Sequence, residues 1–402
     1  MSVSPPETPG APPKDALSRP VWSVFGMPVD AVSLDEAEAG VRAAVRERRR
    51  LSFVTPNLNW LVRALRDETA MRQIREADLS LADGAPVVWM ARKLGAPVPE
   101  RVAGSDLFDR LRRKRPGEAP IRVYFLGGRA GAAEKAAERL NAGNGGMIAC
   151  GHLNPGYGDV ASMSAPVILD TINRARADFL VVSLGAAKGQ AWISANQHRL
   201  NAPVIAHLGA VVDFVAGTVA RTPESWAQNG FEWLWRIKSE PALFTRYWND
   251  GLALLRLVPG RLWPLQHDLA HQGEADNAPA RASFARNGAG SAVRLSGALV
   301  SGGLDDVVAA LQAARRAGGD IRIDLSGACR VDAAFAGLLL TLGEAVRRSG
   351  HGLEVRGAGA GPARVLRALG IEMRPMAHSL RPCPPIPVLP ETPTETENEN
   401  LL

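Results

Sequence analysis

Polar and glycine residues that could bind a ligand follow five short apolar runs between residues 51 and 208. These residues are Thr55-Pro56-Asn57, Asp83-Gly84, Gly127-Gly128, Gly185 and Gly209. In an open α/β sheet, ligands bind beyond the carboxyl ends of the strands, where helix amino ends present free N–H groups. A single glycine there is equally well explained as a turn residue. The five positions together predict one binding site along one edge of a sheet.

Asp83 is the candidate for acid–base chemistry. A carboxylate at the mouth of a cleft can take the proton of an attacking hydroxyl group. The alternative is a helix N-cap, because Asp directly before a helix commonly caps it. Thr55 and Asn57 could orient a substrate through a hydroxyl and an amide group, or could simply end a strand in a turn. The residue types alone leave both pairs of alternatives open.

Arginine side chains could neutralise a diphosphate, because the guanidinium group pairs with phosphate oxygens in a fork. The alternative for any one arginine is a solvated surface cation. The sequence has no Asp-x-Asp motif, and no two of its three cysteines stand at metal-ligand spacing, so we expect neither a metal site nor a cofactor.

The surrounding sequence predicts alternating strands and helices, and these elements must position the residues named above. The expected strands are the apolar runs 51–54, 79–82, 121–126, 179–184 and 203–208, and helical spacing covers 57–76 and 130–140. Ser33 and Glu36 form a capping-box signature before another helix. This alternation predicts an α/β fold with a Rossmann-like, mostly parallel sheet.

Composition places the chain among ordinary globular proteins. Of 402 residues, 46% are hydrophobic and 22% charged, and the net charge of +6 suits acidic partners. The three cysteines show no disulfide pattern, the proline-rich start has no secretory signal, and no run of about 20 apolar residues could span a bilayer. These features predict a cytoplasmic protein whose membrane role, if it has one, is peripheral.

Changes in composition divide the chain into segments. The expected segments are a disordered N-terminus (1–20), a main α/β domain (21–220), an amphipathic appendage (221–263), a polar linker (264–290), a small second α/β domain (291–376) and a disordered tail (377–402). The linker predicts two separate folded units.

The appendage is rich in aromatic and basic residues. Five of the nine tryptophans lie between Arg221 and Pro264, and an apolar helix face begins near Phe244. Tryptophan and arginine together suit the headgroup boundary of a bilayer. A core-packing helix with a solvated basic side fits the pattern equally well. Nucleic acid is not expected as a partner, because no nucleic-acid fold signature is present.

Several motifs between about Phe25 and Leu257 match one family in order. They are Thr55-Pro56-Asn57, Ala82-Asp83-Gly84, Glu100 through Asp106, Phe125 through Gly128, Leu184-Gly185-Ala186, Gly209-Ala210, Asp213 through Gly217, and Glu232-Trp233-Leu234. On these residues the chain resembles the WecG/TagA/CpsF glycosyltransferases. The resemblance implies an inverting, metal-independent hexosyltransferase that uses a UDP-sugar donor and an undecaprenyl-diphosphate-linked saccharide acceptor. It also implies exopolysaccharide or cell-wall polymer biosynthesis at the inner face of the cell membrane.

The same resemblance implies roles for individual residues. Asp83 becomes the catalytic base, with Thr55 beside it. Substrate-binding roles fall to Asn57, Arg101, Gly127, Gly185, Gln190, Asp213, Arg236 and Arg246. Two departures stand out: Leu243 replaces an expected arginine, and Lys188-Gly189-Gln190 replaces the usual Lys-Gln-Glu. We expect Gln190 to take over hydrogen bonds from the neighbouring position.

The second domain resembles a STAS domain. The match lies in Val293 through Gly297, Asp324 through Gly327, Val331-Asp332 and Gly337-Leu338-Leu339. Regulated members have a serine after the aspartate, whereas Ala333 stands here, so we expect binding of a protein partner without phosphoswitching. A nucleotide-binding oxidoreductase is disfavoured, because no Gly-x-Gly-x-x-Gly follows the first strand. An inactive transferase-like scaffold, recruiting a partner through this domain, is the alternative function.

Overall fold

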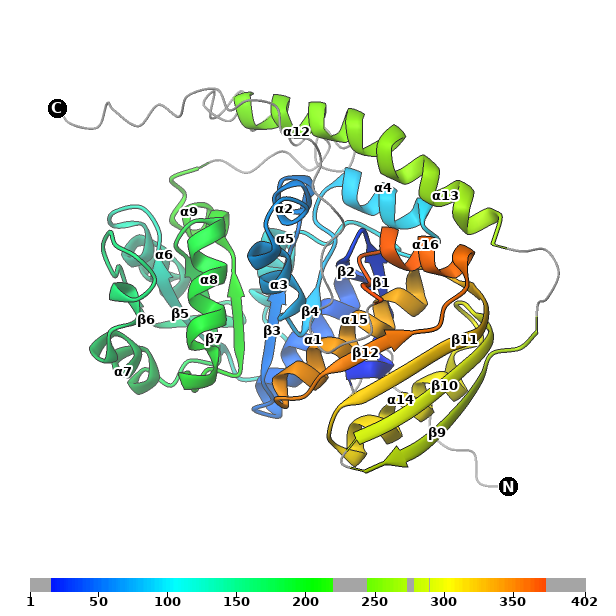
Figure 1. Ribbon diagram of the computed structural model, residues 1–402. Coiled ribbons are helices and arrows are strands. Elements are labelled where there is room, and N and C mark those ends of the chain that lie inside the picture. The colour runs from blue at the N-terminus through cyan, green and yellow to red at the C-terminus, as the bar shows by residue number, and fades with distance from the viewer. Residues whose placement is uncertain (1–15, 220–243, 273–277, 289, 374–402) are drawn as a thin grey trace, which may run out of the picture.

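The computed structural model describes residues 16–219, 244–272, 278–288 and 290–373 (Figure 1). Arg236, most of the predicted appendage, most of the N-terminal segment and the predicted tail lie outside these residues. The described chain forms a larger α/β domain, a two-stranded hairpin, a long helical segment and a smaller α/β domain. The α/β class expected from the sequence is confirmed.

Six parallel strands form the sheet of the larger domain, in the order β4-β3-β8-β7-β5-β6. The strands are β3 (Leu51–Val54), β4 (Leu79–Ser80), β5 (Ile121–Gly127), β6 (Met147–Leu153), β7 (Phe179–Ser183) and β8 (Val204–His207). All five expected strands are present. The sequence analysis missed β6, an edge strand that is only partly buried and has no continuous apolar run.

Helices cover both faces of this sheet (Figure 1). One face carries α1 (Leu34–Arg46), α5 (Gly104–Leu111), α6 (Ala132–Ala142) and α9 (Gly209–Ala216). The other carries α7 (Pro166–Arg174) and α8 (Ala186–Asn196), with the short helices η2 (Ser162–Ser164) and η3 (Gln197–Arg199) beside them. The chain leaves β5 toward α6 on one face and leaves β7 toward α8 on the other. The gap between β5 and β7 is therefore a topological switch point, where sheets of this type bind ligands.

Helix starts follow the local sequence. Ser33 and Glu36 make the expected capping box at α1. The helical stretch predicted at 57–76 is two helices, α2 (Leu58–Ala64) and α3 (Glu68–Arg75). The break lies at Asp67, whose carboxylate accepts the Thr69 N–H and starts α3. α4 (Ala85–Lys93) follows β4 and packs near the hairpin.

The predicted linker is shorter than 264–290. One long rod is formed by three consecutive helical elements: α12 (Phe244–Leu257), the π-helical turn η5 (Val258–Leu262) and α13 (Trp263–Ala270) (Figure 1). The rod packs against the rest of the molecule, since its residues Leu257, Leu262 and Leu265 are all buried. At the other end, residues 281–287 already form a strand of the second domain.

The smaller domain has a mixed four-stranded sheet in the order β12-β11-β10-β9. Its strands are β9 (Arg281–Asn287), β10 (Gly290–Leu299), β11 (Ile321–Val331) and β12 (Leu353–Arg356), and its helices are α14 (Asp305–Ala317), α15 (Ala333–Arg348) and α16 (Ala360–Ala368). Only β9 pairs antiparallel. The expected small α/β domain is confirmed, and it includes more of the chain at its beginning.

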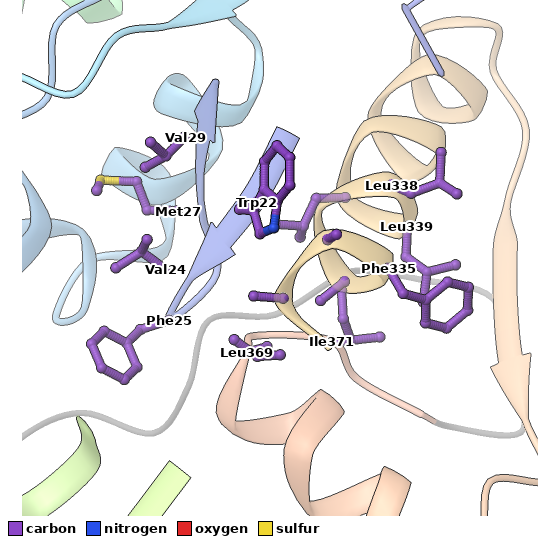
Figure 2. Packing of buried hydrophobic residues seen from close by; sticks show 14 of the residues in the cluster. Trp22, Val24, Phe25, Met27, Val29, Phe335, Leu338, Leu339, Leu369 and Ile371 are labelled. Atoms are coloured by element: carbon purple, nitrogen blue, oxygen red, sulfur yellow. The ribbon is translucent and has the colours of Figure 1, made fainter. Parts of the chain in front are cut away.

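The two α/β units share a hydrophobic core, so they are not the separate bodies that a linker suggested. The hairpin of β1 (Val21–Val24) and β2 (Met27–Asp30), preceded by η1 (Ala16–Ser18), packs between them. Figure 2 shows Trp22 of β1 beside α15, the helix that carries Phe335, Leu338 and Leu339, and all four side chains belong to one buried cluster. A Cβ at Gly337 would lie 2.2 Å from the Val21 carbonyl oxygen, so only glycine permits this approach.

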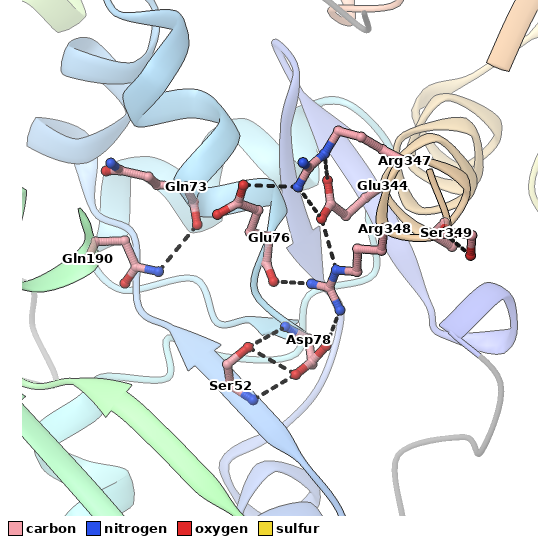
Figure 3. Close-up of polar contacts among 10 residues, drawn as sticks. Ser52, Gln73, Glu76, Asp78, Gln190, Glu344, Arg347, Arg348 and Ser349 are labelled. Carbon is pink, nitrogen blue, oxygen red and sulfur yellow. Dashed lines mark hydrogen bonds and ion pairs between the residues drawn. The ribbon is translucent and has the colours of Figure 1, made fainter. Parts of the chain in front are cut away.

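Ionic contacts flank this shared core (Figure 3). Arg347 pairs with Glu76 at 2.9 Å, and Arg348 pairs with Asp78 at 3.0 Å. Asp78 also accepts hydrogen bonds from the amide and hydroxyl groups of Ser52, at 2.8 and 2.9 Å. The smaller domain thereby contacts the amino ends of β3 and β4, the same two strands whose carboxyl ends carry Thr55 and Asp83.

Candidate active site

Three loops meet at the carboxyl ends of β3 and β4. The Asp83 amide donates to the Pro56 carbonyl at 3.0 Å, and the Val102 amide donates to the Ala82 carbonyl at 2.9 Å. A Cβ at Gly104 would lie 2.4 Å from Leu208 and 3.3 Å from the Thr55 Oγ1 atom. Gly104 is therefore required for the close approach of α5 to the strand ends, and it brings the Arg101 loop beside Thr55.

The Asp83 carboxylate lies in an ionic cluster at this edge. Its Oδ1 atom is 3.4 Å from Nη1 of Arg101, whose Nη2 donates to Asp106 at 2.8 Å. A quarter of the Asp83 side chain is exposed. The N-cap of α4 is Gly84, with φ of 101° and no side-chain capping bond. The N-cap position of α4 is therefore held by Gly84 and not by Asp83, whose carboxylate lies at the edge of the sheet.

Arg101 was expected to bind substrate phosphate. In the structure it bridges two carboxylates, Asp83 and Asp106. A guanidinium in this position holds the Asp83 carboxylate in a fixed orientation. The arrangement assigns Arg101 a positioning contact with Asp83.

Asn57 caps α2 through its side chain. Its Oδ1 atom accepts the Trp60 amide at 3.3 Å. The residue thus has the structural role that the turn interpretation described, and it remains next to Thr55 on the same loop. A Cβ at Gly84 would lie 3.7 Å from the Asn57 Cβ, so this loop and the Asp83 loop are in contact.

Gly127 and Gly185 lie on either side of the switch point between β5 and β7. Gly127 has φ of 90°, and a Cβ there would lie 2.5 Å from the Ser183 carbonyl oxygen. Gly128 donates to the same oxygen at 2.7 Å. Gly185 precedes α8 with φ of 77°, and the space that its Cβ would enter is open. The amino end of α8, with no side-chain cap, can therefore face an anionic ligand.

Gln190 and Asp213 make contacts inside the fold. Gln190 is buried between α8 and α3, where its Nε2 atom donates to the Gln73 carbonyl at 3.3 Å (Figure 3). The Asp213 carboxylate accepts from the Thr218 hydroxyl at 3.4 Å, at the end of α9. The structure gives neither residue a described contact with the Asp83 cluster.

Of the two appendage arginines, the structure describes Arg246 alone. Arg246 is exposed on α12, with its guanidinium carbon 5.1 Å from the centre of the Tyr247 ring. Arg236 lies outside the described residues.

Asp250 is a site residue that the sequence analysis missed. It is buried where α12 crosses α2, and its Oδ1 atom accepts from the Asn59 amide group at 3.1 Å. Burial raises the pKa of Asp250, although the Asn59 hydrogen bond and the charge of Arg246 partly oppose this. The signal was present in the sequence: Asp250 lies three and seven residues before Ala253 and Leu257, on the buried face of the helix.

His207, the last residue of β8, was also missed. Its ring is buried, with its centre 6.0 Å from that of Trp60. Burial lowers the pKa of His207 to about 4, so the imidazole is neutral near pH 7. A Cβ at Gly189 would lie 2.1 Å from the His207 Cδ2 atom. The unusual glycine at 189 thus has a physical reason, because the imidazole fills the space beside it.

Two broader properties of the described residues bear on the chemistry. None of their helices is long and apolar enough to cross a bilayer. Among the same residues, no three His, Cys, Asp or Glu side chains are grouped so that they could hold a metal ion. A nucleophilic displacement assisted by Asp83 and by nearby positive charge is the chemistry that the described groups could perform.

Comparisons with known proteins identify two families along the chain. The family described as glycosyl transferase WecG/TagA/CpsF matches residues 22–267, and the family described as Mlab, STAS domain, matches residues 282–380. A Bacillus spizizenii relative named N-acetylglucosaminyldiphosphoundecaprenol N-acetyl-beta-D-mannosaminyltransferase is 28% identical over 194 residues, covering 48% of this chain and 73% of the relative.

A solved structure of an SsGBP variant aligns with 62% of this chain and 85% of its own, at 11% identity and a TM-score of 0.19. That score lies far below the value for a shared fold. The family match covers more than half of the chain and contains the Asp83 cluster. The chain belongs to the WecG/TagA/CpsF family of glycosyltransferases and carries a STAS domain after its transferase domain.

Proposed function

We propose that the protein transfers a hexose or N-acetylhexosamine, with inversion, from a UDP-sugar to an undecaprenyl-diphosphate-linked saccharide. The product would serve exopolysaccharide or cell-wall polymer biosynthesis. The relative's name supports the lipid-linked acceptor, since it describes transfer to N-acetylglucosaminyl-diphosphoundecaprenol. The observation that carries the proposal is the placement of Asp83 and Thr55 at one sheet edge, where Gly84 and not Asp83 is the N-cap of α4.

Asp83 acts as the general base of this reaction. An acceptor hydroxyl oxygen attacks the anomeric carbon as its proton passes to the Asp83 carboxylate. The bond from the anomeric carbon to the diphosphate oxygen breaks, and UDP leaves with the electron pair. Arg101 holds Asp83 in place, and Thr55 orients the reacting hydroxyl from the adjoining strand end.

The charge on departing UDP is neutralised by groups of the protein, without a metal ion or cofactor. The open amino end of α8 supplies N–H groups at the switch point. Arg246, and Arg236 from outside the described residues, supply guanidinium groups from the appendage. Asn57, Gly127, Gly185, Gln190 and Asp213 complete or support the substrate site.

The rod formed by α12 and α13 places the enzyme on the inner face of the cell membrane. Phe244, Trp248, Leu255 and Trp263 are all more than half exposed on it, although their side chains are large and apolar. Arg246 and Arg256 are also exposed on this helix. Exposed aromatic and basic residues together suit an anionic bilayer surface, where the lipid-linked acceptor lies.

A direct assay tests the proposed reaction. Purified protein is incubated with a panel of UDP-sugars and an undecaprenyl-diphosphate-linked N-acetylglucosamine, and the lipid product is analysed by mass spectrometry. We expect one donor to give a product of β linkage, in buffer with or without a chelator. Absence of product from every donor would contradict the proposed function, and a strict need for magnesium or manganese would contradict its metal independence.

Membrane binding has its own test. Trp248→Ala and Trp263→Ala together should lower co-sedimentation with phosphatidylglycerol vesicles by about 10-fold or more, because each ring buries a large apolar area. Tyr157→Ala is the matched control, since Tyr157 is a fully exposed aromatic residue on the loop after β6. Equal co-sedimentation of the two variants would place the membrane contact elsewhere.

A further inference from the structure

His207 and Gly189 share one space at the carboxyl edge of the sheet. Gly189 lies in the first turns of α8, and His207 ends β8. A Cβ at position 189 would lie 2.1 Å from Cδ2 and 2.8 Å from Nε2 of the imidazole. Neither atom could remain in place beside a larger residue. A side chain therefore enters this space from position 207 or from position 189, and here it enters from 207.

The Nε2 atom of His207 is a buried polar atom without a hydrogen-bond partner among the described residues. Burying such a group without a partner is unfavourable. The ring is held by packing, against Trp60 on one side and the glycine backbone of α8 on the other. Packing alone would be served as well by an apolar residue, so the nitrogen itself needs an explanation.

The position of Nε2 points to a ligand. It would lie 3.5 Å from a Cβ at Gly209, the first residue of α9, and 2.8 Å from a Cβ at Gly189 in α8. Both helices direct their amino ends toward the sheet edge, and the space at Gly185 is open. The nitrogen is therefore beside the first turns of α8 and α9, close to the glycines at positions 189 and 209.

The charge state of the imidazole limits what it can bind. Burial lowers the pKa of His207 and keeps the ring neutral near pH 7. A neutral imidazole adds no charge that would favour a diphosphate, whereas it can donate to or accept from a hydroxyl or amide group. Hydroxyl and amide groups are what distinguishes one hexose or N-acetylhexosamine from another.

We propose that His207 is a specificity-determining residue, whose Nε2 atom hydrogen-bonds a hydroxyl or amide group of the transferred sugar. This inference rests on the proposed function, because it takes the sugar of the UDP-sugar donor as its ligand. It replaces the expectation that Gln190 takes over the hydrogen bonds of the neighbouring position, since Gln190 is directed toward α3. Position 207 forms this hydrogen bond instead, from the end of β8.

Nuclear magnetic resonance of the full-length protein with ¹⁵N-labelled histidine tests the contact directly. The chain has seven histidines, and the His207→Leu variant identifies the resonances of His207. We expect the donor that is used in transfer to shift the His207 Nε2 resonance, and UDP alone to leave it unshifted. An unshifted resonance with the transferred donor would overturn the inference, as would an equal shift with UDP alone.

Kinetic measurements separate recognition from folding. His207→Leu should lower kcat/KM for the preferred donor by about 10-fold and reduce discrimination between UDP-sugars, which is the effect of losing one neutral hydrogen bond. Its melting temperature near pH 7 should be equal or higher, because a buried unpaired polar atom is removed. His152→Leu, at an exposed histidine on β6, is the matched control. A lower melting temperature with unchanged donor discrimination would show a structural role and overturn the inference.

The space shared by Gly189 and His207 allows a second, independent test with variants at both positions. Gly189→Gln alone should lose folding stability or activity, because the amide side chain meets the imidazole. Combining it with His207→Gly should restore the melting temperature and return transfer with an altered donor preference. A double variant no better than Gly189→Gln would contradict the shared space. A wild-type protein that transfers no sugar would instead contradict the proposed function and remove this inference with it.

Discussion

The sheet edge around Asp83 and the interface between the two domains both use charged residues, yet they use them differently. At the interface Arg347, Arg348, Glu76, Asp78 and Glu344 satisfy one another beside a closed apolar core. At the edge the α8 amino end has no side-chain cap, and His207 Nε2 has no partner among the described residues. Polar groups that satisfy each other hold a fold together, whereas groups with spare capacity are available to a substrate.

The interface also bears on the role of the STAS domain. The face of α15 that follows Asp332 is buried against the hairpin of the transferase domain. Asp332 itself is used within the domain, since its two carboxylate oxygens accept from the amides of Phe335 and Ser301. Gln272, just beyond α13, bonds both the amide and the carbonyl of Val331. The partner of this face is the transferase domain of the same chain, which disfavours the scaffold alternative in which the face recruits another protein.

The largest difference between the sheet edge and the domain interface is expected in the rate of transfer after substitution of Asp83. Asp83→Asn should lower kcat for transfer by about 100- to 10,000-fold, because a general base contributes that much, while UDP binding and melting temperature stay near the wild-type values. Asp170→Asn, at an exposed position on α7, is the control. Turnover within a few fold of wild type would remove Asp83 from the mechanism.

Substitutions at the interface between the two domains should lower folding stability rather than the rate of sugar transfer. Gly337→Leu places a side chain where the Val21 backbone lies, so we expect the free energy of unfolding to fall by about 3 kcal/mol or more. Gly251→Ala is the matched control, because a Cβ there meets nothing and the helix gains propensity. Chemical denaturation measures both. A Gly337→Leu protein as stable as wild type would mean that the two domains do not depend on this contact.

His207, at the sheet edge, should make the stability of the folded protein depend on pH. Its pKa is lowered by burial from the ordinary histidine value of 6.5 to about 4 in the folded protein, so the unfolded chain binds the proton more readily between these values. Stability should therefore fall as the pH falls from about 6.5 to about 4, by roughly 3 kcal/mol. Denaturation at a series of pH values should show this slope in wild type and not in His207→Leu. The same slope in both proteins would assign it to other groups.

The smallest effect is expected at the ionic contacts of the interface. Arg347→Ala should cost less than about 1 kcal/mol of stability, because half of the side chain is exposed and solvent screens the pair. The cost should shrink further at high salt. A loss of several kcal/mol, independent of salt, would mean that these ion pairs, and not the apolar core, hold the domains together.

Much of the fold could be predicted from the sequence, because it depends on local patterns. Five of the six strands are continuous apolar runs, and Ser33 and Glu36 specify the start of α1 through contacts only three residues apart. Strand β6 was missed, since an edge strand with one buried residue lacks such a run. The predicted linker was too long, because it included part of the helical rod. The leucines of the rod are buried by distant parts of the chain, which a local pattern does not indicate.

By itself, the sequence determined which chemical groups follow each strand, including Asp83 after β4 and Thr55 after β3, and the family to which the motifs belong. Tertiary structure decided which of those groups stay available. It directed Gln190 toward α3, paired Arg101 with Asp83 and Asp106, and placed Asp250 beside Asn59 across 191 positions of the chain. It also set His207 in the space left by Gly189. The physical reason is that burial and hydrogen-bond partners come from residues far apart in the sequence, and no local pattern records them.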